Sequence, residues 1–177
     1  PIMAAGERQY FHVKNLVLFF GIFLASTHLV HASEFTHRFY RMIHLLQSTS
    51  TGRDLLQIAK QKWGWSRDEE LVSILKWSDV SRTDAVLTRH FDPVTGLEER
   101  NRHVTIFLKE RQTDMELVLD LAHELLHAVS DPDWDPYDPS LTPESYIHAA
   151  LEGRGGEINA LLTECKIALE LYGRTER

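Results

Sequence analysis

The pentapeptide His123-Glu124-Leu125-Leu126-His127 combines two imidazoles and a carboxylate at a spacing that suits metal chemistry. On an α-helix, residues four positions apart lie on one face, about one turn from each other. His123 and His127 are therefore predicted to bind one metal ion, with Zn–N bonds of about 2.0–2.1 Å. Glu124 would project near the same face without binding the metal, where a general base for a metal-activated water has to lie.

The residues around this pentapeptide predict one helix over residues 114–130. Thr113 or Asp114 can cap its start, and Asp131-Pro132 ends it, because proline disfavours helical geometry in the residue before it. Apolar residues recur in this segment at spacings of three and four, which is the core-facing stripe of a helix: Leu117, Val118, Leu121, Ala122, Leu125 and Val129. The two histidines and Glu124 fall on the other, polar side.

A catalytic zinc ion commonly has three protein ligands and one water, so a third ligand is needed. The candidates downstream of the pentapeptide are His148, Glu152, Glu157 and Glu164. Gly155 and Gly156 directly precede Glu157 and permit close backbone packing there, which favours Glu157 over Glu152. Glu164, two turns beyond Glu157, shares its face and could bond to a ligand histidine instead.

With this pattern the sequence resembles the zincin metallopeptidases, and among them the gluzincins, in a small single-domain form. His123, Glu124 and His127 match their H-E-x-x-H helix, and the segment Glu157-Ile158-Asn159-Ala160 matches the E-x-x-A form of their glutamate helix. The resemblance covers roughly residues 103–172 and implies Zn²⁺ held by His123, His127 and Glu157. Leu161 replaces the aspartate that orients a ligand histidine in many gluzincins, so that role would fall elsewhere, for example to Asp120 or Asp131.

The resemblance also implies an activity, which is zinc-dependent hydrolysis of peptide bonds by a metal-activated water with Glu124 as general base. An additional donor would stabilise the oxyanion. Among Tyr137, Tyr146, His148 and Arg154, we favour Tyr146 and His148 for this role. The segment 103–109 resembles the edge strand along which zincins align an extended peptide or protein substrate.

Two other functions fit the same residues. The chain could be a non-catalytic, zinc-binding interaction module with a zincin fold. Bound zinc together with no cleavage across a wide panel of peptides would favour this alternative. It could also be an amidase that acts on cell-wall material. The resemblance to peptidases makes peptide hydrolysis the leading hypothesis.

An apolar run near the N-terminus predicts export. Arg8 and Lys14 precede the run over residues 16–25, which is well short of the roughly 20 residues that span a bilayer. The segment Val30-His31-Ala32 has the small-residue pattern of a signal-peptidase site before Ser33. Residues 1–32 are predicted to be a signal peptide and residues 33–177 a single zincin-like metallohydrolase domain. The mature protein is expected to be periplasmic or secreted, without a stable membrane anchor.

The composition narrows the partners. The chain of 177 residues has 19 basic and 26 acidic side chains and a net charge of −7. No basic stripe is present, so nucleic acid is not an expected partner. Cys165 is the single cysteine, which excludes a multi-cysteine zinc site. Its helical spacing from Leu161, Leu162 and Leu169 predicts that it is buried.

The remaining patterns predict an α+β fold that is mainly helical with a small antiparallel sheet. Trp63, Trp65 and Trp77 are expected to pack in the core. Strands are predicted at 84–91 and 103–109, with a third short strand near 97–102. Helices are predicted before the strands at 34–47, 53–63 and 66–77, and after them at 114–130, from 142 onward and at 157–172.

Overall fold

The computed structural model describes residues 36–131, 134–135 and 138–173. The described residues from Phe39 onward belong to one compact unit. The predicted signal peptide, residues 1–32, lies outside the described residues. Within the part of the chain that the structure describes, no helix combines the length and the apolar character needed to cross a bilayer.

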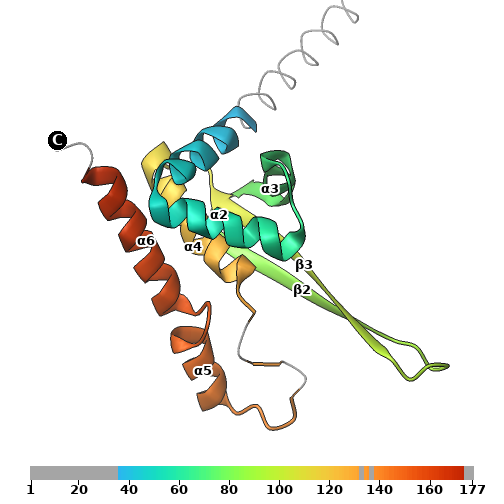
Figure 1. The fold of residues 1–177 in the computed structure, drawn as a ribbon. Helices are drawn as coiled ribbons and strands as arrows, with labels where there is room; N and C mark the ends of the chain where they lie inside the picture. The colour runs from blue at the N-terminus through green and yellow to red at the C-terminus, as the bar shows by residue number, and fades with distance from the viewer. Residues whose placement is uncertain (1–35, 132–133, 136–137, 174–177) are drawn as a thin grey trace, which may run out of the picture. The chain divides into compact units, whose positions relative to one another are not determined.

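The predicted α+β fold class is confirmed. Helical residues 39–48 come first. The elements that follow are α2 (Ser50–Trp63), α3 (Asp68–Ile74), β1 (Leu75–Ser78), β2 (Arg82–Phe91), β3 (Glu98–Lys109), α4 (Asp114–Val129), α5 (Pro143–Glu152) and α6 (Glu157–Tyr172) (Figure 1). The pentapeptide helix and the last helix begin where their sequence patterns placed them.

The sheet has three strands in the order β1-β3-β2. β2 and β3 pair antiparallel, as predicted, and Val86 lies opposite His103 in their register. Two expectations were wrong. The segment 66–77 is not one helix, because its last residues leave α3 and pair parallel with β3 as β1. The expected third strand near 97–102 is instead the first half of β3, which continues without a break to Lys109.

The hydrophobic core lies between the sheet, α4 and the first two helical segments. α4 contributes its predicted stripe, and β3 contributes Ile106 and Leu108, which are both fully buried. Trp63, Trp65 and Trp77 are partly buried and pack against this core, which confirms the expected packing role. The rings of Phe39 and Trp77 stack with their centroids 4.4 Å apart. This packing fixes which face of α4 remains available for chemistry.

Both ends of α4 are held by side chains. At its start the Thr113 hydroxyl accepts a hydrogen bond from the Glu116 amide, and the Glu116 carboxylate accepts one from the Thr113 amide, which forms a capping box. At its end the half-buried guanidinium of Arg102 donates to the carbonyl oxygens of His127, Ala128 and Ser130. These carbonyls lack partners within the helix, and a cation there also complements the helix dipole.

α6 packs through a narrower face than its sequence predicted. Ala160, Ile167 and Leu171 are buried against neighbouring elements. Cys165, which was expected to be buried, is exposed instead, and Leu161, Leu162 and Leu169 are each at least half exposed. The prediction was wrong because α6 is apolar on two sides, and periodicity alone does not tell which side meets the core.

Candidate metal centre and cleft

The structure brings His123, His127 and Glu157 together at one point between α4 and α6. His123 Nε2 lies 3.3 Å from Glu157 Oε2, and His127 Nε2 lies 3.5 Å from Glu157 Oε1. One ligand atom from each of the three residues lies within 4.8 Å of the others. The pentapeptide spacing puts both imidazoles on one face of α4, and the start of α6 delivers the carboxylate to that face.

This arrangement fits a metal ion. Bonds of about 2.1 Å at tetrahedral angles separate neighbouring ligand atoms by roughly 3.4 Å, which matches both imidazole–carboxylate distances. Each imidazole turns its Nε2 atom toward the shared point. His123, His127 and Glu157 therefore form a group that could hold a metal ion.

The other nitrogen of each imidazole has its own partner. His127 Nδ1 lies 2.7 Å from the carbonyl oxygen of Gly155, and His123 Nδ1 lies 3.3 Å from Glu164 Oε2. A carbonyl only accepts hydrogen bonds, so His127 donates through Nδ1, and in the neutral ring this leaves Nε2 as the atom that can bind a metal. Such partners fix the orientation of ligand histidines and increase their basicity.

The orienting role thus falls to Glu164 and Gly155. Of the alternatives raised from the sequence, Asp120 accepts a hydrogen bond from Ser81. Asp131 pairs instead with Lys62. The Glu164 contact had been foreseen because Glu157 and Glu164 are two turns apart on one helix face. The Gly155 contact had not been foreseen, because any main-chain carbonyl can accept a hydrogen bond from a histidine and the sequence does not show which one does.

The glycines before Glu157 permit close packing, as the sequence predicted: Gly155 lies against Ser130 at the end of α4, and Gly156 lies against the backbone of α5. Gly155 has φ of 70°, a conformation that favours glycine. A Cβ atom on Gly155 would lie 2.0 Å from the Cβ of Ser130, and one on Gly156 would lie 2.8 Å from two backbone oxygens. The chain can therefore enter α6 at Glu157 only because residues 155 and 156 have no side chains that would clash with Ser130 and with α5.

Glu124 lies beside the histidines, and only 8 % of its surface is exposed. Burial raises the pKa of its carboxyl group, and this effect is opposed by the Thr83 hydroxyl and by His123 and His127 nearby. The Thr83 hydroxyl on β2 also donates to the main-chain carbonyl of Glu124 at 2.8 Å, which ties the edge of the sheet to the pentapeptide.

A cleft of about 1350 Å³ opens over these residues. His123, Glu124, His127 and Glu157 all line it. Thr83, Ala85 and Leu87 line one wall, and their spacing of two places them on one face of β2. β3, the strand expected at the sheet edge, is the central strand, so this expectation was wrong and β2 is the edge strand beside the cleft.

The other residues proposed from the sequence separate into two groups. Tyr146 and Arg154 line the cleft, and the Tyr146 ring meets the Trp134 ring edge-on at 5.0 Å between centroids. His148 and Glu152 pair with each other at 3.3 Å on the exposed side of α5, and neither lines the cleft. Tyr137 lies outside the described residues.

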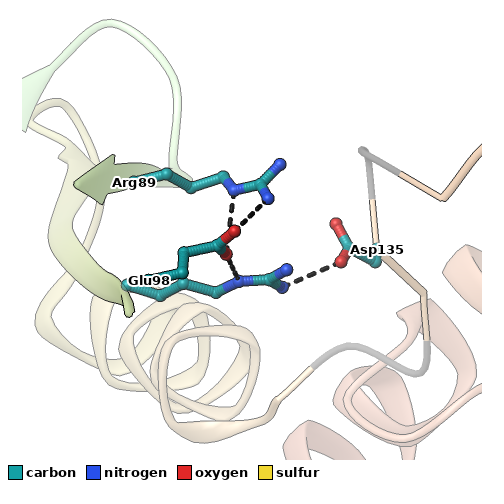
Figure 2. Close-up of polar contacts among 4 residues, drawn as sticks. Arg89, Glu98 and Asp135 are labelled. Atoms are coloured by element: carbon teal, nitrogen blue, oxygen red, sulfur yellow. Dashed lines mark hydrogen bonds and ion pairs between the residues drawn. The ribbon is translucent and has the colours of Figure 1, made fainter. Parts of the chain in front are cut away.

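Arg100 connects the hairpin to the segment that follows α4. Its guanidinium donates to Asp135 at 2.8 Å and also to Glu98, which in turn accepts from Arg89 at 3.0 Å (Figure 2). Arg89 and then Arg100 lower the pKa of Glu98 to about 2. Arg100 and Asp135 both line the cleft, so this ion-pair cluster forms part of its rim.

Sequence reasoning missed two residues that support the site. Arg102 binds the last carbonyls of α4, including that of His127, and Thr83 binds the carbonyl of Glu124. Each contact joins residues 25 or more positions apart in the chain. The sequence offered no signal for either contact, because Thr83 lay outside the predicted strands and neither side chain identifies its partner.

Among the described residues, one group of three acidic, cysteine or histidine side chains could hold a metal ion. It consists of His123, His127 and Glu157. It combines two residues of α4 with the first residue of α6, whose start packs against the end of α4 through Gly155. Comparison of the chain with models of protein families, with curated proteins and with solved structures finds no match.

Proposed function

We propose that this protein is a zinc metallopeptidase of the zincin type, in which His123, His127 and Glu157 hold Zn²⁺. The observation that carries the proposal is the convergence of these three ligand candidates, whose ligand atoms lie within 4.8 Å of one another, with the buried carboxylate of Glu124 beside them in one cleft. Two imidazoles and one carboxylate are a common ligand set of catalytic zinc. Ca²⁺ and Mg²⁺ prefer ligands that are all oxygen.

Bound Zn²⁺ would supply Lewis acidity, which polarises a substrate carbonyl and makes a water molecule a stronger nucleophile. Glu124 would take the proton from the attacking water and pass it to the leaving amine. Its burial supports this role, because a carboxylate with a raised pKa is a stronger base and takes a proton from water more readily than an exposed one.

The chain's other cleft residues would position the substrate. An extended peptide would lie along β2, whose outer edge has no neighbouring strand in the described sheet. The phenol of Tyr146 would donate a hydrogen bond to the oxyanion that forms at the scissile carbonyl. Tyr146 is preferred over His148 because Tyr146 lines the cleft and His148 does not.

The first experiment combines metal analysis with hydrolysis of casein and of a quenched peptide library. We expect one zinc per wild-type chain and measurable cleavage. Glu124→Gln should retain zinc and lose cleavage by about 10²- to 10⁴-fold, the usual contribution of a general base. Glu152→Gln is the matched control, because Glu152 is a nearby carboxylate outside the cleft, and it should retain both properties.

The ligand set is tested separately. His123→Ala, His127→Ala and Glu157→Gln should each reduce zinc occupancy. Full zinc occupancy in Glu157→Gln would remove Glu157 from the site, and equal cleavage by wild type and Glu124→Gln would remove Glu124 as the base. Stoichiometric iron in place of zinc would point to oxygen chemistry, for which the same ligand set also serves. Stoichiometric zinc without cleavage of any peptide would favour a binding module over an enzyme.

A further inference from the structure

α6 has a second apolar face that is independent of the metal centre. Its inner side is buried through Ala160, Ile167 and Leu171. Its outer side exposes one contiguous row, here named the α6 stripe, which consists of Ile158, Leu161, Leu162, Cys165, Leu169 and Tyr172. At about 100° per residue, these six positions fall within roughly 100° of one another around the helix.

A row of this kind is unusual on a surface helix. Large contiguous apolar patches on a protein surface mark contact sites. Among the described elements α6 packs against α4, α2 and α5. Figure 1 shows α6 beside α4 and α2, with no described element along its opposite side. Leu169, which is 75 % exposed, shows how little of the stripe these neighbours cover.

The spacing of the stripe is the same when read in either direction. Ile158, Leu161, Cys165, Leu169 and Tyr172 are separated by three, four, four and three residues. A two-fold axis through the centre of such a row places each residue opposite an apolar one on an antiparallel copy. Ile158 would meet Tyr172, Leu161 would meet Leu169, and Cys165 would meet itself. Isologous contacts require this self-complementarity.

The size of the stripe agrees with a contact between copies. Its large side chains are about half exposed or more, so it presents on the order of 600 Å² of mainly apolar surface per chain. Two copies would bury about 1,200 Å² in total, which is the lower end of the range for specific interfaces. The inner and outer faces of α6 point in opposite directions, so such a contact would not displace the core packing.

We propose that the protein forms a two-fold symmetric dimer in which the α6 stripes of two copies pack antiparallel, with the two Cys165 side chains at the axis. Glu157 and Glu164 lie outside the stripe and face the histidines of α4, so the dimer leaves the metal centre open. The proposal does not depend on the metal or on catalysis.

The single cysteine makes the interface directly testable in the full chain. Under reducing conditions, sedimentation over micromolar concentrations should show a reversible species with twice the mass of the 20.5 kDa chain. Diamide, which takes up the two thiol hydrogens, should then join Cys165 to Cys165 of the second copy rapidly. A disulfide requires Cα atoms about 4.4–6.8 Å apart, so fast crosslinking reports this contact.

Leu169→Glu and Leu97→Glu form the matched pair, because both leucines are strongly exposed and only Leu169 belongs to the stripe. Both variants retain Cys165 and the whole N-terminal segment, so any association through that segment affects them equally. Leu169→Glu should weaken dimerisation by about 10- to 100-fold, as a charge in an apolar contact does, and Leu97→Glu should leave it unchanged. Leu162→Glu provides a second stripe variant, and circular dichroism checks the fold of each.

The direction of the helices is tested in a Cys165→Ser background. Chains that carry Ile158→Cys should crosslink to chains that carry Tyr172→Cys, and neither should crosslink efficiently to itself. Self-crosslinking of each would overturn the antiparallel arrangement. A chain that sediments as a monomer, equal crosslinking of Leu169→Glu and Leu97→Glu, or binding of monomeric chain to phosphatidylcholine vesicles through the stripe would overturn the dimer.

Discussion

The two halves of the β2–β3 hairpin share one hydrogen-bond ladder but have opposite surroundings. In the half near α4, Ile106 and Leu108 are fully buried. In the far half, Phe91 is 61 % exposed and Leu97 is 69 % exposed, and Figure 1 shows this end extending away from the helices. Burial stabilises the near half, whereas the ladder and exposed side-chain contacts hold the far half.

The polar contacts differ in the same way. Near α4, Thr83 and Arg102 bind main-chain carbonyls of the helix that carries the histidines. In the far half, Arg89, Glu98 and Arg100 pair with one another in solvent (Figure 2). Exposed ion pairs contribute little to stability, whereas hydrogen bonds to partly buried carbonyls contribute more. We therefore infer that the near half positions the candidate metal site, whereas the far half reaches the cleft only at its rim, through the pair of Arg100 with Asp135.

The largest contrast is expected for two leucines. Leu108→Ala leaves a cavity in the core and should lower the free energy of unfolding by about 2–5 kcal/mol. Leu97→Ala removes an exposed side chain and should change it by less than about 0.5 kcal/mol. Urea unfolding of both variants measures the difference. Equal losses would mean that the far half is covered in solution.

The next contrast is between two arginines. Arg102→Met removes the hydrogen bonds to three carbonyls at the end of α4 and should cost on the order of 2 kcal/mol of unfolding free energy. It should also weaken zinc binding, because the last turn of α4 contains His127. Arg89→Met, on the exposed part of β2, should leave zinc affinity unchanged. Competition with a chromogenic chelator measures this affinity, and equal loss in both variants would contradict the division of the hairpin.

A smaller contrast is expected for two threonines that both bind main-chain oxygens. Thr83→Val keeps the shape of the side chain but removes the hydrogen bond to Glu124, with an expected loss of about 1 kcal/mol. Thr88→Val removes a bond of 3.2 Å to Asn101 in solvent and should have almost no effect on unfolding. If cleavage is detected, kcat should fall in Thr83→Val only. An equal change in kcat for Thr88→Val would show that the far half also influences the site.

The smallest effect concerns pH. Hydrogen bonds from Arg89 and then Arg100 lower the pKa of Glu98 from 4.5 to about 2. As the pH falls, the carboxylate of Glu98 is protonated in the unfolded chain before it is protonated in the folded chain. The contribution of Glu98 to stability is therefore complete above about pH 4.5 and is lost toward pH 2. The carboxyl resonance of Glu98 in NMR should titrate near pH 2 and shift upward in Arg89→Met. Titration near 4.5 in the wild type would show that the cluster does not persist in solution.

Several elements could be predicted because their signals are local. α4 and α6 follow from apolar residues at helical spacing, and the cap at Thr113 follows from its own neighbours. β1 was missed because four residues that suit a helix end become a strand only when β3 lies beside them. Cys165 was placed on the wrong side because both sides of α6 are apolar.

The sequence by itself determined that two imidazoles share one helix face with a carboxylate between them, and that two glycines precede a later glutamate. These features depend on spacings within single segments, where helix geometry leaves little freedom. Only the tertiary structure decided that Glu157 meets the histidines, that Glu164 and Gly155 orient them, and that Arg102 and Thr83 hold their helix. The reason is physical, because these contacts join distant parts of the chain that meet only after the core has packed.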